Sequence, residues 1–376
     1  MKLLNTSIFD SSALRKADKN IFYLYFIFVG IGLIFIYSVS RYAIRDTELN
    51  ANAIFFKQFI FAIISIVLML LFIQIDYRIT RVIVKPIFFL SLILLVLVFI
   101  PGIGLQIGLA RRWIDFRFFS FNPSEFAKIS LIIYLAHIFV KKHEHIANFT
   151  SGLLPPLLLV AMMFCTILLQ SGFSIGAIIV IVMFTMIFAG GASLKHIVSI
   201  ILLTIPIMIL AVWNVAYRKD RILAYIDPWQ DPSGIGYQSI ESLKALAHGG
   251  FFGVGLGNSI QKISRLPAAH TDFIFAIIVE ETGLIGGITL ASLFLWFFLH
   301  GLKISFRTKD SYGKLLAFGI VTLITTHALL NMMINMGLLP PTGVSLPFIS
   351  YGGSSFVMLS IATGILLNIS SHISAR

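Results

Sequence analysis

The chain has 376 residues, of which 58% are hydrophobic and only 12% are charged. A soluble domain of this size could not cover so much apolar surface, so its solvent must be lipid. The net charge of +12 could suggest nucleic acid, but in a membrane protein it is typical of loops that face anionic lipid headgroups. The single cysteine, Cys165, excludes an intrachain disulfide.

Apolar runs long enough to cross a bilayer, about 20 residues each, recur along the chain. The first run follows a polar, basic segment and has no A-x-A-like exit, which predicts a retained span and not a cleaved signal. The uncharged stretch 146–194 is too long for one helix and is broken at Gln170-Ser171-Gly172. We therefore predict ten membrane-spanning helices, at 21–40, 58–75, 86–104, 121–140, 154–170, 173–190, 196–216, about 273–300, and on either side of the break at 337–343 within 315–375.

The basic N-terminus favours cytoplasmic termini, because Lys and Arg collect on the inner side of membranes. We expect cytoplasmic tails at 1–20 and 371–376 and a single all-α domain of about ten transmembrane helices at 21–370. The longest loop, about 217–272, then lies outside the cytoplasm between helices seven and eight, with nearly all of the unusual polar residues. An amphipathic stretch at 240–247 predicts a short helix that lies in the membrane interface.

Ionisable side chains at membrane depth are costly, so each marks a candidate site. Glu125 and Lys128 stand one turn apart on the fourth helix, where they can form a purely structural pair or Lys128 can contact a phosphate. Glu280 and Glu281 must face the protein interior or a wet cavity. At about 12 Å from Asp272 along a helix they cannot share its reacting centre, so we expect a structural role or contact with a partner.

Two further segments carry groups suited to substrate binding and catalysis. Arg111 and Arg112 offer guanidinium groups that bind phosphate in a bidentate manner, and Trp113 could stack on a sugar or simply anchor the helix. Asp272, at the start of the eighth helix, could be an N-cap, which the helix dipole favours. Capping does not explain why His270-Thr271 precede it in a cavity-forming loop opposite a basic rim.

Three stretches resemble signatures of the SEDS (shape, elongation, division, sporulation) glycosyltransferases. The first runs from Arg111 to Lys128 and contains Arg-Arg-Trp-Ile-Asp-Phe and Phe-Asn-Pro-Ser-Glu-Phe-Ala-Lys. The second, His270–Glu281, is similar to the family's span-eight signature, and the third, Gly337–Ser355, to its C-terminal signature. The resemblance covers most of the chain from about residue 21 onward, and the three motifs together are highly specific.

Smaller segments bear on the branch of the family. Gly255–Lys262 is similar to the division-type members, whereas elongation-type members usually have a different segment there. The family commonly has Gln-Pro-Asp between spans five and six, but here Gln170-Ser171-Gly172 keeps only the glutamine, so no acid at this point can take part in catalysis. Asn122 replaces the usual glutamine. The resemblance therefore favours a division-type protein, with an elongation-type protein as the alternative.

The resemblance implies a peptidoglycan polymerase at the outer face of the bacterial cytoplasmic membrane, at the division septum. It would join the disaccharide of lipid II to a strand carried on undecaprenyl pyrophosphate. Asp272 would be the general base, kept ionised by neighbouring cations, and positive charge would stabilise the leaving pyrophosphate. The expected substrate-binding residues are Arg111, Arg112, Trp113, Glu125, Lys128, Arg221, His270, Ser350 and Tyr351.

The resemblance also implies partners. A class B penicillin-binding protein, a transpeptidase with one span, would pack near helices eight and nine, and other division proteins would join it. Nucleic acid is not an expected partner. A divalent cation such as Mg²⁺ could bridge the pyrophosphate, although no protein metal site and no carboxylate cage are visible in the sequence.

Two other classes of function stay open at this point. A lipid II flippase or other transporter would use the same cavity and charges without covalent chemistry, but such proteins often show inverted repeats, which are not evident here. A scaffold that only recruits a partner would not need so many charges at one cavity mouth. Polymer formation from lipid II by the purified protein would separate the three.

Overall fold

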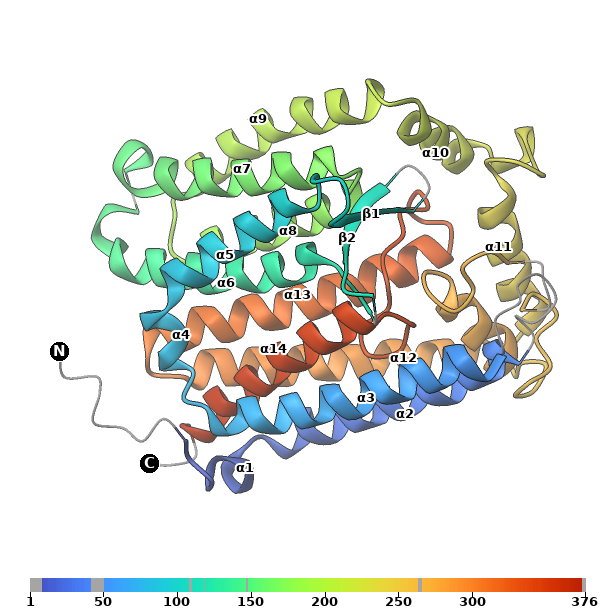
Figure 1. Cartoon of the computed structure of the whole chain (residues 1–376), viewed down its shortest axis with the longest axis horizontal. Helices are drawn as coiled ribbons and strands as arrows, with labels where there is room; N and C mark the ends of the chain where they lie inside the picture. The colour runs from blue at the N-terminus through green and yellow to red at the C-terminus, as the bar shows by residue number, and fades with distance from the viewer. Residues whose placement is uncertain are drawn as a thin grey trace.

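A computed structural model describes residues 9–41, 51–107, 110–117, 119–146, 148–262 and 266–373. Long helices lie side by side, and the start of α2 and the end of α14 lie at the same end of the bundle (Figure 1). Eight helices in the described ranges are long and apolar enough to cross a membrane, and α5 and α8 are shorter apolar helices. The bundle helices are α2 (Lys19–Ser40), α3 (Ala51–Gln74), α5 (Val84–Leu97), α6 (Pro123–Lys141), α7 (Leu154–Leu169), α8 (Phe173–Ala189), α9 (Leu194–Trp213), α12 (Ile274–Arg307), α13 (Ser311–Asn335) and α14 (Gly353–Ser371).

The all-α membrane fold predicted from the apolar runs is confirmed. Each predicted span has a helix at its position, and many large apolar side chains on these helices stay exposed, as lipid contact requires. Leu202, Leu203 and Leu210 on α9, for example, are 59–67% exposed. Lipid tails are as apolar as these side chains, so such a surface is stable only inside a membrane.

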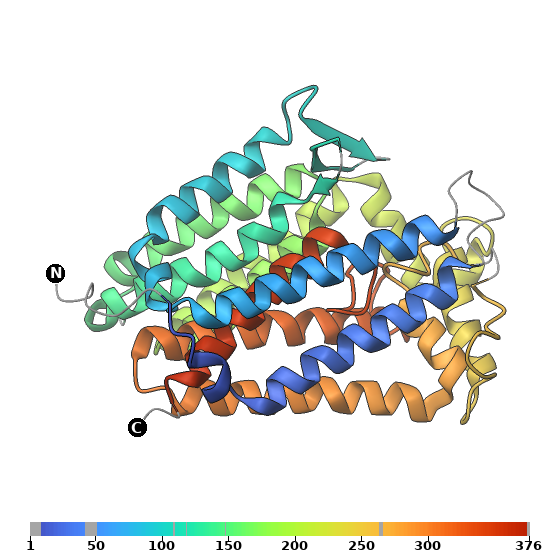
Figure 2. The ribbon, with the colours of Figure 1, turned by 60° about the horizontal axis from the view of Figure 1, so that its bottom comes forward.

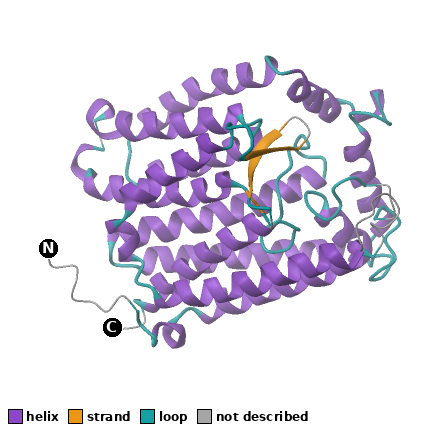
Figure 3. Ribbon diagram, in the orientation of Figure 1, coloured by secondary structure: helices purple, strands orange, loops and turns teal. Residues whose placement is uncertain are grey.

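The third predicted span is wrong at its end. It was expected to reach residue 104, but α5 ends at Leu97 and a three-stranded antiparallel sheet follows, drawn in orange in Figure 3. The strands are β1 (Gly104–Ile107), β2 (Ala110–Asp115) and β3 (Ser120–Phe121). A Cβ on Gly104 would lie 1.8 Å from the Val98 carbonyl oxygen, so only glycine lets β1 return over the end of α5.

The eighth predicted span is two helical pieces. Gly283 has φ +73° and ψ −175°, which breaks α12 into residues 274–282 and 284–307. A Cβ on Gly287 would lie 2.9 Å from Val279 Cγ2 and 3.7 Å from Phe275 Cζ, although residues 275 and 287 would be about 18 Å apart in a straight helix. The first piece therefore folds back beside the second, at the end of the bundle that carries the loops (Figure 2).

The predicted long loop at 217–272 is largely structured. It contains the short helices α10 (Ala216–Ile226), η4 (Pro228–Gln230) and α11 (Tyr237–Gly249), and α11 confirms the helix predicted at 240–247. Figure 1 shows α10, α11, β1 and β2 at the end of the bundle away from the start of α2; we call this the loop-bearing end. The remaining short elements are α1 (Ala13–Lys16), α4 (Arg78–Val82), η2 (His143–His145) and η3 (Phe149–Leu153).

Candidate active site

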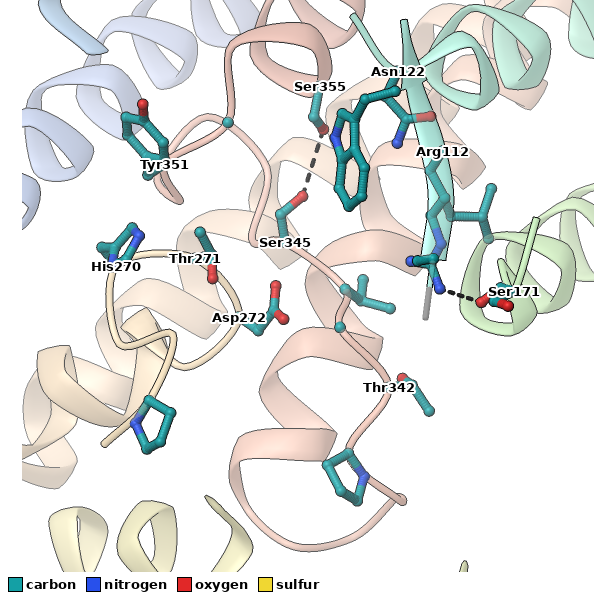
Figure 4. A pocket seen from close by; sticks show the side chains of 18 of the residues that line it. Arg112, Asn122, Ser171, His270, Thr271, Asp272, Thr342, Ser345, Tyr351 and Ser355 are labelled. Atoms are coloured by element: carbon teal, nitrogen blue, oxygen red, sulfur yellow. Dashed lines mark hydrogen bonds between the residues drawn. The ribbon is translucent and has the colours of Figure 1, made fainter. Parts of the chain in front are cut away.

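A cavity of about 1140 Å³ lies at the loop-bearing end of the bundle. Its walls come from β2, the first turns of α6 and α8, the helix α10, the turn before α12, and the segment between α13 and α14. Figure 4 shows side chains from β2, from the turns before α6, α8 and α12, and from the segment between α13 and α14 around one space. The volume is ample for a sugar-sized group, since ligand pockets commonly enclose about 300–1,000 Å³.

Asp272 lies on this cavity and is held through its backbone. Its carbonyl oxygen accepts hydrogen bonds from Asn331 Nδ2 at 2.8 Å and from Asn335 Nδ2 at 2.9 Å. Asn335 Oδ1 in turn accepts the Ala276 amide at 3.0 Å. Sequence reasoning missed both asparagines, although two amides at i and i+4 on an otherwise apolar helix are a detectable signal.

The carboxylate of Asp272 is directed into the cavity and is not a helix cap. The N-cap position of α12 is Phe273, and the first-turn amide of Ala276 is bound by Asn335 and not by Asp272. The interpretation of Asp272 as an N-cap is therefore wrong. A Cβ on Gly343 would lie only 3.3 Å from Asp272 Oδ2, and Gly343 has φ +68°, so a glycine at this position leaves room for the carboxylate.

Burial raises the pKa of the Asp272 carboxyl to about 6, against the opposing effect of Arg221 and then Arg112, whose positive charges lower it. We expected the neighbouring cations to dominate, but desolvation outweighs them. A carboxyl group with a pKa near 6 is still mainly ionised at pH 7 and is a stronger base than an exposed aspartate.

The two arginines that act on Asp272 are anchored by backbone carbonyls. On β2, Arg112 donates from Nε to the Gln170 carbonyl at 3.3 Å, and its NH2 group donates to the Ser171 carbonyl. Arg221, on α10, donates from NH1 to the Pro341 carbonyl at 3.0 Å. Both line the cavity. Their guanidinium groups are thus oriented near Asp272, where a negatively charged leaving group would also lie.

Arg111, the neighbour of Arg112 on β2, is not among the cavity-lining residues; it donates from Nε to Gln106 Oε1 at 3.1 Å. Lys57, at the start of α3, supplies a cation that sequence reasoning missed. It lies just before the predicted second span, where a basic residue next to the membrane attracts no notice. The basic rim of the cavity therefore includes Arg112, Arg221 and Lys57.

Glu125 and Lys128 form a buried ion pair of 2.9 Å, with Lys128 only 2% exposed. Lys128 Nζ also lies 2.8 Å from His327 Nε2 on α13. Glu125 and His327 line the cavity, but Lys128 does not. Of the two sequence interpretations of Lys128, the structural pair fits this geometry. A direct phosphate contact does not, because the ammonium group is enclosed.

His270 and Tyr351 line the cavity together, with ring centroids 5.5 Å apart. Burial lowers the pKa of the His270 imidazole and raises the pKa of the Tyr351 phenol, so both rings are neutral near pH 7. Trp113 also lines the cavity. Ser350 does not: its hydroxyl donates to the Thr271 carbonyl at 2.5 Å and accepts the Leu346 amide at 2.7 Å, which gives it a structural role.

Two other sequence expectations concern acidic groups. Glu280 and Glu281 are 0% and 1% exposed, so of the two roles expected for them the structural role fits this geometry, and direct contact of their side chains with a partner does not. For a metal, no group of three or more His, Cys, Asp or Glu side chains in the described ranges could hold an ion. The charged groups that act on the Asp272 carboxyl are Arg221 and Arg112.

Comparison with known proteins gives relatives along nearly the whole chain. A probable peptidoglycan glycosyltransferase FtsW from Geobacter metallireducens is 42% identical over 347 residues, which are 91% of this chain and 91% of the relative. Stage V sporulation protein E from Bacillus subtilis is 39% identical over 343 residues, 91% of this chain and 93% of the relative.

Solved structures confirm the fold. A chain from a structure titled "Structural coordination of polymerization and crosslinking by a peptidoglycan synthase complex" has a TM-score of 0.78 at 24% identity and covers 96% of this chain and 99% of its own. Rod shape determining protein RodA from Thermus thermophilus has a TM-score of 0.69 at 21% identity, with 94% and 96% covered. The family profile described as cell cycle protein, for FtsW, RodA and SpoVE, matches residues 18–375, and this chain therefore belongs to the FtsW/RodA/SpoVE family.

Proposed function

We propose that this protein is a peptidoglycan glycosyltransferase of the division type, which polymerises lipid II at the outer face of the cytoplasmic membrane. One observation carries the proposal: a carboxylate with a raised pKa faces a large cavity beside two oriented arginines. Relatives about 40% identical that are named FtsW favour the division role over the elongation role.

The proposed chemistry follows from the positions of these charges. Asp272 accepts the proton of the acceptor sugar hydroxyl as its oxygen attacks the anomeric carbon of the donor. The bond from that carbon to the pyrophosphate oxygen breaks, and undecaprenyl pyrophosphate leaves with the bonding electron pair. Arg112 and Arg221 stabilise the negative charge that develops on it. The proton then passes from Asp272 to water, which restores the base.

The other cavity residues suit a sugar substrate. Trp113 presents an aromatic face, and His270 and Tyr351 present neutral hydrogen-bonding groups. Lys57 adds a positive charge at the rim. The steps assigned to this chain are proton transfer, orientation and charge stabilisation, and a divalent cation such as Mg²⁺ at the pyrophosphate is compatible with them.

The geometry favours polymerisation over lipid II flipping. A transporter needs a site that can open to both sides of the membrane. Here the cavity lies at one end of the bundle, and the buried Glu125–Lys128 pair with His327 lies at its inner wall. A charged lipid headgroup passing that point would have to break an ion pair in an apolar interior.

We propose, for the same reasons, that the loop-bearing end faces outward and both termini face the cytoplasm. The partner would be a class B penicillin-binding protein, whose span would lie against α12 and α13. The α12 surface there is apolar, with Leu284, Ile285, Ile288 and Leu295 45–58% exposed. It can take a partner helix by close packing without any contribution from the two buried glutamates.

The first prediction concerns Asp272→Asn. The backbone carbonyl that binds Asn331 and Asn335 is unchanged, so the variant should fold and accumulate normally. Without a carboxylate to accept the proton, the rate of polymerisation should fall by about 10²–10⁴-fold. Polymer length and yield from purified lipid II in liposomes measure this. A rate close to wild type would remove Asp272 from the mechanism, and Glu125 would be examined next.

The second prediction concerns pH. Asp272 acts only when deprotonated, and its pKa is about 6, so the rate should be maximal above that pH and should fall as the pH drops through it. Arg221 is the larger of the two influences that lower this pKa. In Arg221→Gln the pKa rises, and the acidic limb of kcat/KM should move to higher pH. An unmoved limb in the variant would contradict the assignment of Asp272 as the titrating base.

The third prediction tests topology. Ser233, at the loop-bearing end, and Ser311, at the start of α13, are both exposed. Cys165 is exposed, so single cysteines at 233 or 311 are placed in a Cys165→Ser background. A membrane-impermeant maleimide should label position 233 in intact cells and position 311 only after lysis. The reverse pattern would show that the protein is inserted the other way round.

The fourth prediction tests the partner. Purification of the tagged protein in mild detergent from its own host should recover a class B penicillin-binding protein. Ile288→Lys, which places a charge on the apolar face of α12, should reduce that recovery while the protein still accumulates; Leu202→Lys on α9 is the matched control. Absence of any transpeptidase from the purified protein, together with full polymerase activity, would refute this partnership.

A further inference from the structure

The orientation of the helical segment that follows Asp272 is set by its tertiary contacts. Residues 274–282 form two and a half turns and end at Gly283, where the helix breaks. A helix this short is only marginally stable without tertiary contacts. Because Gly283 interrupts the helix, the rest of α12 does not fix the orientation of residues 274–282. Asn331 and Asn335 hold it at Asp272. The other end is held by Glu280 and Glu281.

Glu281 is fixed by three groups from two distant segments. Its Oε1 lies 2.6 Å from Lys262 Nζ and accepts the Ser38 hydroxyl of α2 at 3.1 Å, and its Oε2 accepts the Gly257 amide at 2.9 Å. Lys262 Nζ also donates to Ser38 Oγ at 2.9 Å. Both side chains of the Lys262–Glu281 pair are 0% exposed. Water therefore does not screen this pair.

Glu280 faces a second set of donors. Its Oε1 accepts the Ile260 amide at 3.1 Å and lies 2.9 Å from His248 Nδ1, and its Oε2 accepts the Ser259 hydroxyl. The Glu280 side chain is 0% exposed, whereas His248 is 43% exposed. The two adjacent glutamates thus both bind the segment 248–262, which begins at the end of α11.

The backbones of the loop and the helix are also in contact. The Val254 amide donates to the Glu280 carbonyl, and the Gly255 amide to the Glu281 carbonyl, both at 3.0 Å. A Cβ on Gly253 would lie 2.2 Å from the Glu281 carbonyl oxygen. We call this assembly the glutamate clamp: Glu280 and Glu281 with Lys262, Ser38, Ser259 and His248.

Stability alone does not explain a clamp of this kind. A buried ion pair pays a desolvation cost, and well-packed apolar side chains of similar volume are often as stable or more so. An ion pair with hydrogen bonds to fixed donors holds the bonded side chains in one orientation, whereas apolar packing constrains orientation less. The clamp also brackets Asp272 in the chain, with Lys262 ten residues before it and Glu281 nine residues after it.

We propose that Lys262, Glu280 and Glu281 are positioning residues for glycosyl transfer, which orient the 274–282 helix so that the Asp272 carboxylate meets the acceptor hydroxyl. The inference rests on the proposed function. These residues touch neither the cavity nor the substrate; they act through Asp272. Their loss should therefore affect turnover and leave substrate binding unchanged.

The test is the double variant Lys262→Met/Glu281→Met, which removes both charges, keeps the side-chain volume and leaves no buried ion unpaired. A misplacement of about 1 Å at a reacting group can cost about 10²-fold. We expect kcat for lipid II polymerisation to fall by about that factor, with KM within about twofold of wild type. The acidic limb of kcat/KM should also move, because the separation of Asp272 from Arg221 changes; a purely structural loss would not move it.

The control is Lys244→Met/Glu241→Met, which removes a different Lys–Glu ion pair of the same loop-bearing end, 2.7 Å long. It should leave kcat and the acidic limb unchanged. A clamp variant that folds and turns over at the wild-type rate overturns the proposal. If the double variant does not accumulate, Ser38→Ala decides: it keeps the ion pair but removes the bonds to α2, and an unchanged kcat in it also overturns the proposal.

The proposed function is tested separately by the wild-type protein and Asp272→Asn in the same assay. If wild type makes no polymer, the function itself fails. If wild type is active and Asp272→Asn is not, while the clamp variant matches wild type in kcat and acidic limb, only the positioning role fails.

Discussion

The segments that carry Asp272 and Gly343 in the cavity wall are joined through one backbone oxygen. The Asp272 carbonyl accepts an amide hydrogen bond from each of Asn331 and Asn335. Asn331 Nδ2 also reaches the Val344 carbonyl at 2.6 Å, and Asn335 Oδ1 takes the Ala276 amide. Two side chains on α13 therefore fix the turn before α12, the first turn of α12 and the segment that carries Gly343. In an apolar bundle each bond left unmade costs about 1–3 kcal/mol, so these segments stay together.

Because Asp272 is held through its backbone carbonyl, its carboxylate is not needed to anchor the turn and faces the cavity. A rise of its pKa from 3.8 to about 6 corresponds to a net cost of about 3 kcal/mol for the charged form. This net figure already includes Arg221 and Arg112, whose charges offset the desolvation of the carboxylate only in part. A closer ion pair would lower this pKa and make Asp272 a weaker base.

The sequence predicted the helices well, because a bilayer demands long apolar runs whatever their packing. It predicted Asp272, Arg112 and Trp113 on the cavity through motif resemblance. It did not predict the sheet at 104–121, whose strands are short, although Pro101-Gly102 interrupts the apolar run just before them. The sequence also could not show whether Lys128 faces the cavity. The i,i+3 spacing of Glu125 and Lys128 is visible in the sequence, but the direction in which that helix face points is set by packing.

The fold-back of α12 was equally invisible, since Gly283 is one glycine in an apolar pattern that also contains Gly286 and Gly287. Gly283 differs from these glycines because the backbone of Phe251 and Gly253 packs closely against it. A Cβ on Gly283 would lie 2.3 Å from the Phe251 carbonyl oxygen. The hinge is thus created by a loop 30 residues upstream.

The buried acids of the bundle differ in how their charge is compensated. Glu125 is paired with Lys128 beneath the cavity, and Glu281 with Lys262 beyond the 274–282 helix. In both places the cost of burying an acid is offset by an adjacent cation. Asp272, between them, has no ion pair within 4 Å among the described residues. An asparagine at this position would remove the uncompensated charge and its desolvation cost. A charge that is costly in the resting state fits the proposed role of Asp272 as a proton acceptor, since strongly perturbed carboxyl groups in cavities are candidates for catalysis.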